Sequence, residues 1–183
     1  MIRADSIQFR PLQVADLPLM HRWLSTPHVS RWYFLRQPSV PPTYEEVVVH
    51  YTARIAGKEP TKAFLILYEG KPVAYIQSYR IADHPDYGRH IDESADAAGV
   101  DVFIGEAEYI HQGLGPVFIR KFLREIVFAD SRVGSCIIGP EPENRAAIRA
   151  YEKAGFRYVK TIRVPDEPQP EYLMSIVRED VVE

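Results

Sequence analysis

The sequence predicts a mixed α/β protein in which one β-sheet is flanked by helices, as a single domain over residues 1–183 with its core at about 7–178. The length of 183 residues and an apolar content of 46% allow one sizeable core but not two. Two strand-like segments near the middle are joined by a short glycine turn, which indicates an antiparallel hairpin. In the C-terminal half, strands alternate with helices, and such units pair their strands in parallel.

The first elements follow from local patterns. Residues 7–11 alternate apolar and polar side chains and are expected to form a strand. Apolar residues at helical spacing then predict a helix over 17–24, in which Trp23 is a core residue. The prolines around 28–42 predict an irregular loop. Thr43 and Glu46 have the spacing of a capping box, which opens a helix that ends near residue 56.

The middle of the chain contains the hairpin and an acidic stretch. Residues 63–68 and 72–79 are rich in β-branched and aromatic side chains and flank Gly70, so they are expected to pair. The next stretch, 82–98, has no hydrophobic period and is expected to be a surface loop. Its acidic side chains are Asp83, Asp86, Asp92, Glu93 and Asp96.

The remaining elements alternate between strands and helices. A strand is expected over 100–104, and a long amphipathic helix from Gly115 to residue 127. The later segments are a buried strand, a helix that ends at Gly155, and two further strands, over 135–138, 144–154, 156–163 and 171–177.

Composition excludes several classes of protein. A net charge near −3, without a basic stripe, argues against nucleic-acid binding. No apolar run is long enough to span a membrane, and no signal-peptide region is evident, so we expect a cytoplasmic protein. The histidines show no metal-ligand spacing, so no metal is expected. The single cysteine, Cys136, is expected to be a packed core residue rather than a nucleophile.

Two motifs can carry chemistry. The first is a glycine turn that leads into the long helix, where exposed N–H groups attract phosphate oxygens; it comprises Gln112, Gly113, Leu114, Gly115 and Pro116. No Gly-Lys-Ser/Thr follows, and Phe118 stands where a dinucleotide fingerprint has its third glycine. The second motif runs from Asn144 to Phe156. Taken separately, the motifs are also consistent with a tight turn and with a capped amphipathic helix.

The order and spacing of the two motifs resemble the Gcn5-related N-acetyltransferase (GNAT) superfamily. This resemblance implies a mixed sheet splayed between the strands around Val102 and Ile137, with acetyl-CoA as co-substrate. It implies that the glycine turn binds the pyrophosphate, that Asn144 and Ala147 contact the pantetheine arm, and that Tyr151 lies near the thioester sulfur. Ile110 stands where the superfamily usually has Arg or Gln.

Further segments resemble aminoglycoside 6'-N-acetyltransferases over residues 7–178. These segments are 27–33, 75–79 and 99–101, together with the two motifs. The resemblance implies acceptor contacts from Trp32, Tyr33, Gln77, Tyr79 and Asp86. Two positions depart from it: Gly139 stands where those enzymes have an aspartate, and Arg89 where they have a tryptophan. Related enzymes that acylate hydroxylysine-type siderophore precursors carry a histidine in place of Asp101.

An amine acceptor arrives as an ammonium ion and must lose a proton before it attacks a thioester. We therefore expect Asp101, helped by Asp86, to bind the ammonium and accept its proton. The alternative for Asp101 is an exposed strand-end carboxylate, and for Asp86 a solvated loop. Backbone N–H groups near Phe103 and Ile104 are expected to hold the thioester oxygen.

Tyr151 is expected to protonate the departing thiolate or to donate a hydrogen bond to it. No Ser-His or Cys-His arrangement is present, so direct transfer to the amine is expected. The partners expected are a small amine and acetyl-CoA, without nucleic acid or membrane. Other acceptors considered are siderophore precursors and polyamines, and a different class is a catalytically silent acyl-CoA-binding module.

Overall fold

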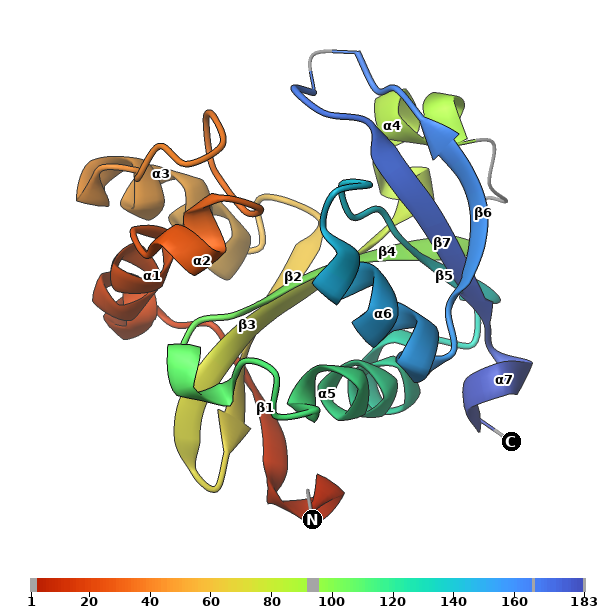
Figure 1. Ribbon diagram of the computed structural model, residues 1–183, viewed down its shortest axis with the longest axis horizontal. Helices are drawn as coiled ribbons and strands as arrows, with labels where there is room; N and C mark the ends of the chain where they lie inside the picture. Colours follow the sequence, from red (N-terminus) through yellow and green to blue (C-terminus); the bar gives the residue numbers. More distant parts are fainter. Residues whose placement is uncertain (1–2, 92–95, 166, 183) are drawn as a thin grey trace. The chain divides into compact units, whose positions relative to one another are not determined.

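The computed structural model describes residues 3–91, 96–165 and 167–182. Within these residues, seven strands form a mixed sheet in the order β1-β2-β3-β4-β5-β7-β6 (Figure 1). The strands are β1 (Ile7–Pro11), β2 (Thr61–Tyr68), β3 (Lys71–Arg80), β4 (Ala97–Ile104), β5 (Ser135–Ile138), β6 (Arg157–Ile162) and β7 (Glu171–Val177). Helices flank the sheet, so the predicted mixed architecture is confirmed.

The helices are α1 (Leu17–Leu24), α2 (Pro27–Ser30), α3 (Tyr44–Ile55), α4 (Pro85–Ile91), α5 (Leu114–Phe122), α6 (Arg145–Ala154) and α7 (Glu179–Val182). Short 3-10 turns lie at Ala4–Ser6, Val14–Asp16, Ile81–Asp83 and Ala107–Tyr109, and a π-helical turn continues α5 over Leu123–Val127.

The chain divides into two compact units. The first comprises residues 3–77 and 102–111, and the second comprises residues 78–101 and 112–182 apart from the gaps. The predicted single domain over 1–183 stays a prediction.

In the first unit, antiparallel strands β1 and β2 pack with α1 and α3 around a core that includes Trp23, Tyr51 and Tyr75. The capping box is present as predicted: Thr43 accepts from the Glu46 N–H, and Glu46 accepts from the Thr43 N–H. The hairpin turn is also present, because Glu69 and Gly70 both have positive φ, at 51° and 78°. Such a two-residue turn matches the twist of the strands that it joins.

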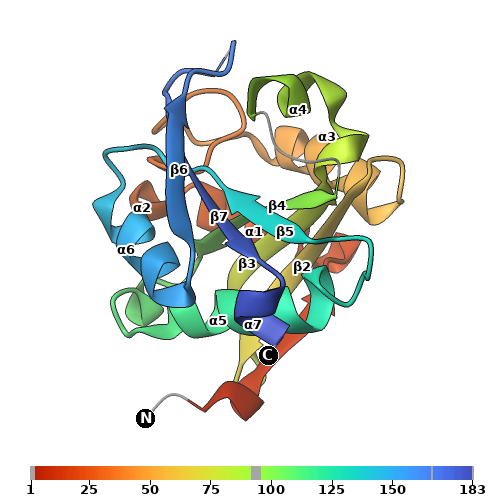
Figure 2. The same ribbon diagram turned by 90° about the vertical axis from the view of Figure 1, so that its right-hand side faces the viewer.

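In the second unit, β4 and β5 pair in parallel over Ala97–Gly99 and Ser135–Ile137 only. The pairing stops at Gly99, although β4 continues to Ile104. A sheet that is splayed after Gly99 requires that the pairing stop in this way. On the other side of β5, β7 pairs antiparallel with β5 and β6, and Figure 2 shows this ribbon beside α7. Helices α5 and α6 lie side by side (Figure 1).

Two loop predictions were wrong. The expected loop 28–42 begins inside a short helix, α2, because Pro27 can occupy the first turn without a hydrogen-bond donor. The expected acidic loop 82–98 contains a 3-10 turn, helix α4 and the start of β4. Tyr87 and Ile91, four residues apart, pack on an apolar cluster with Ile137 and Leu173, which anchors α4. Asp92 and Glu93 lie outside the described residues.

Candidate active site

The glycine turn leaves the start of α5 free of side-chain caps. Gly113 is the N-cap residue with φ of 75°, a left-handed conformation that favours glycine, and no side chain caps the helix there. A Cβ placed on Gly115 would meet only the Ala150 Cβ, at 3.8 Å, so α6 packs close to this turn. Pro116 has no N–H, so the amides available to an anion at this end belong to residues 113–115.

Helix α6 presents the second motif as predicted. The Asn144 side-chain oxygen accepts a hydrogen bond from the Ala147 N–H at 3.2 Å, and Gly155 ends the helix with φ of 108°. The Asn144 amide NH2 thus keeps its donor capacity toward a ligand, whereas Ala147 can offer only its methyl group there. Tyr151 is 8% exposed, and both its burial and the charge of Asp101 raise its pKa. Its phenol therefore stays protonated at neutral pH.

The negative charge of Asp101 affects the pKa of several neighbouring groups in the second unit. This charge raises the pKa of Tyr79, Tyr87, Cys136, Tyr151 and Glu171, although burial is the larger cause for each. The Asp101 side chain is half-buried, which differs from the alternative of an exposed strand end. Cys136 is fully buried in β5 with a raised pKa, so its thiol stays protonated, in agreement with the predicted core role.

Two glycines make room for side chains around Asp101. A Cβ on Gly99 would lie 2.4–2.7 Å from ring atoms of Tyr79, and one on Gly139 would lie 2.4 Å from the Glu171 carboxylate. Because real Cβ atoms do not approach so closely, Tyr79 and Glu171 can occupy their positions only beside glycine. Glu171 also accepts a hydrogen bond from the Tyr87 hydroxyl at 2.7 Å.

Glu171 is a residue that the sequence analysis missed. Burial, together with the negative charges of Asp101 and Glu167, raises its pKa to about 7, although the hydrogen bond from Tyr87 opposes this shift. The signal in the sequence was indirect: Gly139 has no side chain, and the Glu171 carboxylate of β7 occupies the space beside it. Asp86, in contrast, is 91% exposed and pairs with Arg89 at 2.7 Å in the first turns of α4.

The other predicted acceptor residues lie in the first unit. The Tyr33 ring packs 4.8 Å from Phe103 and belongs to the core cluster. The Gln77 side-chain oxygen accepts from the Tyr75 hydroxyl at 2.7 Å and from Arg54 at 2.5 Å. Trp32 is half-buried, with the Arg31 guanidinium 4.5 Å from its ring centroid.

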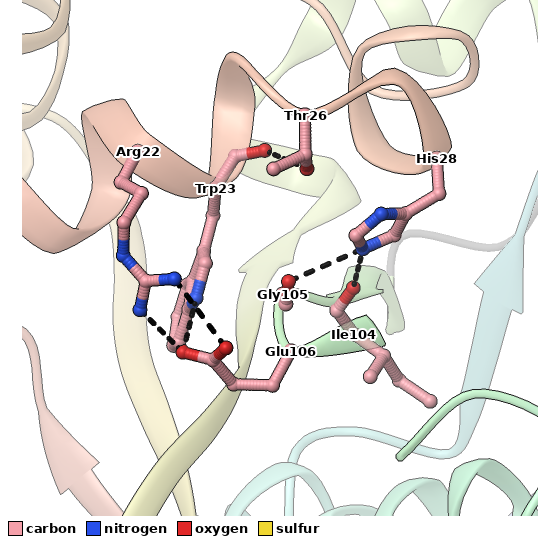
Figure 3. Close-up of polar contacts among 7 residues, drawn as sticks. All are labelled: Arg22, Trp23, Thr26, His28, Ile104, Gly105 and Glu106. Atoms are coloured by element: carbon pink, nitrogen blue, oxygen red, sulfur yellow. Dashed lines mark hydrogen bonds and ion pairs between the residues drawn. The ribbon is translucent and has the colours of Figure 1, made fainter. Parts of the chain in front are cut away.

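Phe103 and Ile104 are the last residues of β4. A polar network fixes the chain around Ile104 and Gly105 (Figure 3). His28 Nε2 lies 3.2 Å from the carbonyl oxygens of both Ile104 and Gly105, so this nitrogen carries the proton. Glu106 accepts hydrogen bonds from Arg22 and from the Trp23 indole N–H, and the Arg22 bond is the largest cause of its lowered pKa. The backbone that is expected to face the thioester is therefore held from two sides.

The comparisons with known proteins identify the family. Residues 13–164 match the Acetyltransferase (GNAT) domain. This chain belongs to the GNAT acetyltransferase family. GNAT enzymes use acetyl-CoA, so the predicted acetyl-CoA-dependent N-acetyltransferase is confirmed.

Relatives of this acetyltransferase cover most of its length. It is 29% identical over 164 residues to the aminoglycoside N(6')-acetyltransferase type 1 of Klebsiella pneumoniae, covering 90% of this chain and 80% of that protein. A lysine N-acyltransferase of Mycobacterium sp. (strain MCS) is 24% identical, covering 86% and 62%. The solved structure of the aminoglycoside acetyltransferase AAC(6')-Ib with paromomycin and acetyl-CoA has a TM-score of 0.83 at 29% identity, covering 96% and 95%.

Within the described residues, no group of three or more potential metal ligands occurs. In the same residues, none of the helices has both the length and the apolar character needed to cross a bilayer.

Proposed function

We propose that this acetyltransferase transfers the acetyl group of acetyl-CoA to a primary amine of a small cationic acceptor of the aminoglycoside type, by direct attack. The observation that carries the proposal is the position of Asp101 among buried tyrosines and a second carboxylate, in the same unit as Tyr151 and the glycine turn. A site rich in carboxylates binds ammonium groups and provides a base for one of their protons. A cytoplasmic location stays a prediction.

The reaction needs three contributions from the chain. Asp101 binds the acceptor ammonium and accepts one proton from it, directly or through water. The free amine then attacks the thioester carbonyl carbon, and backbone N–H groups near Phe103 and Ile104 stabilise the oxygen as negative charge develops. When the carbon–sulfur bond breaks, the Tyr151 hydroxyl donates a hydrogen bond to the departing thiolate. The new bond joins the amine nitrogen to the acetyl carbon, the carbon–sulfur bond breaks, and the nitrogen releases its second proton to solvent, which leaves a neutral amide and CoA as its thiolate.

The raised pKa of Tyr151 favours one of its two possible roles. A phenol with a raised pKa is a weaker acid than the thiol that it would generate. Complete proton transfer to sulfur is therefore unfavourable, whereas hydrogen bonding to the thiolate is not. Tyr151 accordingly serves mainly as a hydrogen-bond donor.

Donor binding uses the two motifs. The amides at the start of α5, from Gly113 through Gly115, bind the pyrophosphate, and the partial positive charge of the helix end favours the anion. Asn144 donates its side-chain amide to the pantetheine arm while its oxygen caps α6. Asp86 contributes long-range charge only, because it is exposed and paired with Arg89.

A second acceptor class has support from one relative. The similarity to a lysine N-acyltransferase makes a hydroxylysine-type amine the next candidate. An aminoglycoside presents a primary amine, whereas N6-hydroxylysine presents a hydroxylamine nitrogen, so a direct comparison of acceptors separates the two classes.

The test is release of free CoA thiol from acetyl-CoA in the presence of kanamycin, N6-hydroxylysine or spermidine, with product masses measured. We expect kanamycin to stimulate thiol release above the acceptor-free rate and to gain one acetyl group. Faster acetylation of N6-hydroxylysine would replace the aminoglycoside assignment. Acetyl-CoA binding without thiol release for every acceptor would instead indicate a silent binding module.

A further inference from the structure

Glu171 is the first residue of β7, and its side chain lies beside Gly139, the residue that follows β5. The Tyr172 N–H donates to the Pro140 carbonyl at 2.8 Å, which extends the β5–β7 ribbon and holds Glu171 beside Gly139. A Cβ on Gly139 would lie 2.4 Å from Glu171 Oε2 and 3.3 Å from Glu171 Cβ. The carboxylate of Glu171 therefore fills the space that a side chain at position 139 would take.

The orientation of this carboxylate is fixed from α4. Tyr87 donates its hydroxyl hydrogen bond to Oε2, and Tyr87 is itself packed on the cluster that contains Ile137 and Leu173. Among the described residues, Asp101 on β4, Glu167 before β7 and the phenol of Tyr79 on β3 also interact electrostatically with Glu171. Within the described residues, no salt bridge involves Glu171.

The charges around Glu171 thus favour a cation from outside the chain. A half-buried carboxylate beside two other acids is costly to ionise, and a bound ammonium lowers that cost for both Glu171 and Asp101. A purely structural partner for the Tyr87 hydroxyl needs no negative charge, since a neutral amide accepts the same hydrogen bond. The hydrogen bond from Tyr87 therefore does not explain why an ionisable acid occupies this position, whereas a bound cation would.

We propose that Glu171 is an acceptor-binding residue that, together with Asp101, selects amines with a second ammonium group. This inference rests on the proposed function, in which Asp101 holds the reacting amine. Glu171 binds the second ammonium, and Tyr87 is a positioning residue that orients its carboxylate. Monoamines have no group for Glu171 and should not depend on it.

The decisive comparison uses two matched sugars, 2,6-diamino-2,6-dideoxyglucose and 6-amino-6-deoxyglucose, which differ in the second amine. In Glu171→Gln, we expect the KM of the diamine to rise ~10–100-fold, because loss of one partner of a half-buried charge pair is costly. We expect kcat/KM for the monoamine to change less than about twofold and the Kd of acetyl-CoA to stay unchanged. Glu179→Gln, which removes an exposed acid on α7, is the matched control.

Equal effects of Glu171→Gln on the two sugars, or no effect on either, would overturn the assignment. Titration calorimetry of the diamine with the CoA-bound protein gives a readout independent of turnover. Diamine binding that depends on Glu171 without acetylation would reject the proposed function but keep this inference. If both sugars are acetylated and Glu171→Gln changes neither rate, the proposed function stands and the role of Glu171 is rejected. If the wild-type protein neither binds nor acetylates the sugars, the proposed function and the role of Glu171 are both rejected.

Relocation of the carboxylate gives a second test. Gly139→Asp in a Glu171→Ala background places an acid, from the residue after β5, in the space that Glu171 vacates. We expect Glu171→Ala to lose the preference for the diamine and the double variant to regain most of it. A double variant with a native melting temperature and no regained preference would contradict the placement of the second ammonium beside position 139.

The role of Tyr87 is read from a pH profile. Below pH 8, the KM of the diamine should fall as pH rises through about 7, because Glu171 becomes charged. Tyr87→Phe should move this midpoint upward, since the Tyr87 hydrogen bond lowers the pKa of Glu171. An unchanged midpoint in Tyr87→Phe, or an equal shift for the monoamine, would rule out the positioning role.

Discussion

The hydroxyl of Tyr87 and the carboxylate of Glu171 lie 2.7 Å apart and connect helix α4 to the first residue of β7. This hydrogen bond joins a helix that the sequence patterns did not predict to a carboxylate that they did not place in the site. Under the proposed function, this pair adds a second carboxylate to the acceptor site, and the titration of Glu171 is expected to affect stability as well as binding.

The stability of the protein should depend on Glu171 in a pH window from about 4.5 to about 7. The folded-state pKa is raised to about 7 from 4.5, so the folded protein retains a proton that the unfolded chain loses. The stabilisation is complete below pH 4.5 and is lost as pH rises through 7. Glu171→Gln has no such loss, so its melting temperature relative to wild type should increase between pH 5 and pH 7.5. The difference corresponds to about 2 kcal/mol, and equal pH profiles would disprove it.

Asp101→Asn should reduce acceptor turnover and leave acetyl-CoA affinity intact, because the carboxylate serves the amine rather than the donor. We expect kcat to fall ~10²–10⁴-fold if Asp101 accepts the proton. Steady-state kinetics with kanamycin and calorimetric titration with CoA measure the two effects, with Asp180→Asn on α7 as the control. Wild-type activity toward every amine that the parent accepts would show that the base lies elsewhere.

Tyr151→Phe should lower kcat by about 10²-fold, the lower end of the range for general-acid groups, because hydrogen bonding rather than full proton transfer is lost. The KM of acetyl-CoA should change little. Tyr158→Phe provides a control on an exposed tyrosine of β6. A loss near 10⁴-fold would mean that Tyr151 transfers its proton completely.

The two glycines of the α5 turn should respond differently to alanine. Gly115→Ala meets only an ordinary contact with Ala150, so unfolding stability should stay equal or increase by roughly 0.5–1 kcal/mol, while the KM of acetyl-CoA rises. Gly113→Ala should also cost stability, roughly 1–2 kcal/mol, because its φ is 75°. Thermal melts and donor kinetics together check this, and an unchanged KM in Gly115→Ala would leave the turn with a purely structural role.

Gly105→Ala should destabilise the first unit without any backbone strain. Its Cβ would lie 2.1–2.4 Å from ring atoms of Trp23, which is fully buried and bonded to Glu106. Such overpacking costs roughly 1–3 kcal/mol, measurable as a lower melting temperature. Gly115→Ala, whose Cβ meets only an ordinary contact with Ala150, controls for the change of residue type. Equal melting temperatures would contradict this packing.

The sequence predicted elements whose signals are local. Thr43 with Glu46, and Gly155 after α6, mark helix ends through their own hydrogen bonds and backbone angles, so the boundaries agree within a residue or two. Helix α4 was missed because Pro85, Gly88 and several charges hide the spacing of Tyr87 and Ile91. Those two residues become helical through packing on β5 and β7, which no local pattern reveals.

The site residues likewise fall into those with a local sequence signal and those without one. Asp101, Tyr151 and the glycine turn could be proposed from motifs, because their chemistry is tied to fixed spacing along the chain. Glu171 could not, because its place beside Gly139 depends on the β5–β7 register. A contact that depends on the pairing of two strands leaves no trace in a linear motif.

The burial of Cys136 has a practical consequence for work on this enzyme. It is the chain's one cysteine, it is fully buried, and its raised pKa keeps the thiol unreactive at neutral pH. Disulfide reagents that report CoA release should therefore give almost no background from the native protein. A cysteine introduced on an exposed surface would become a single labelling position, suited to fluorescent or spin probes without prior removal of a native thiol.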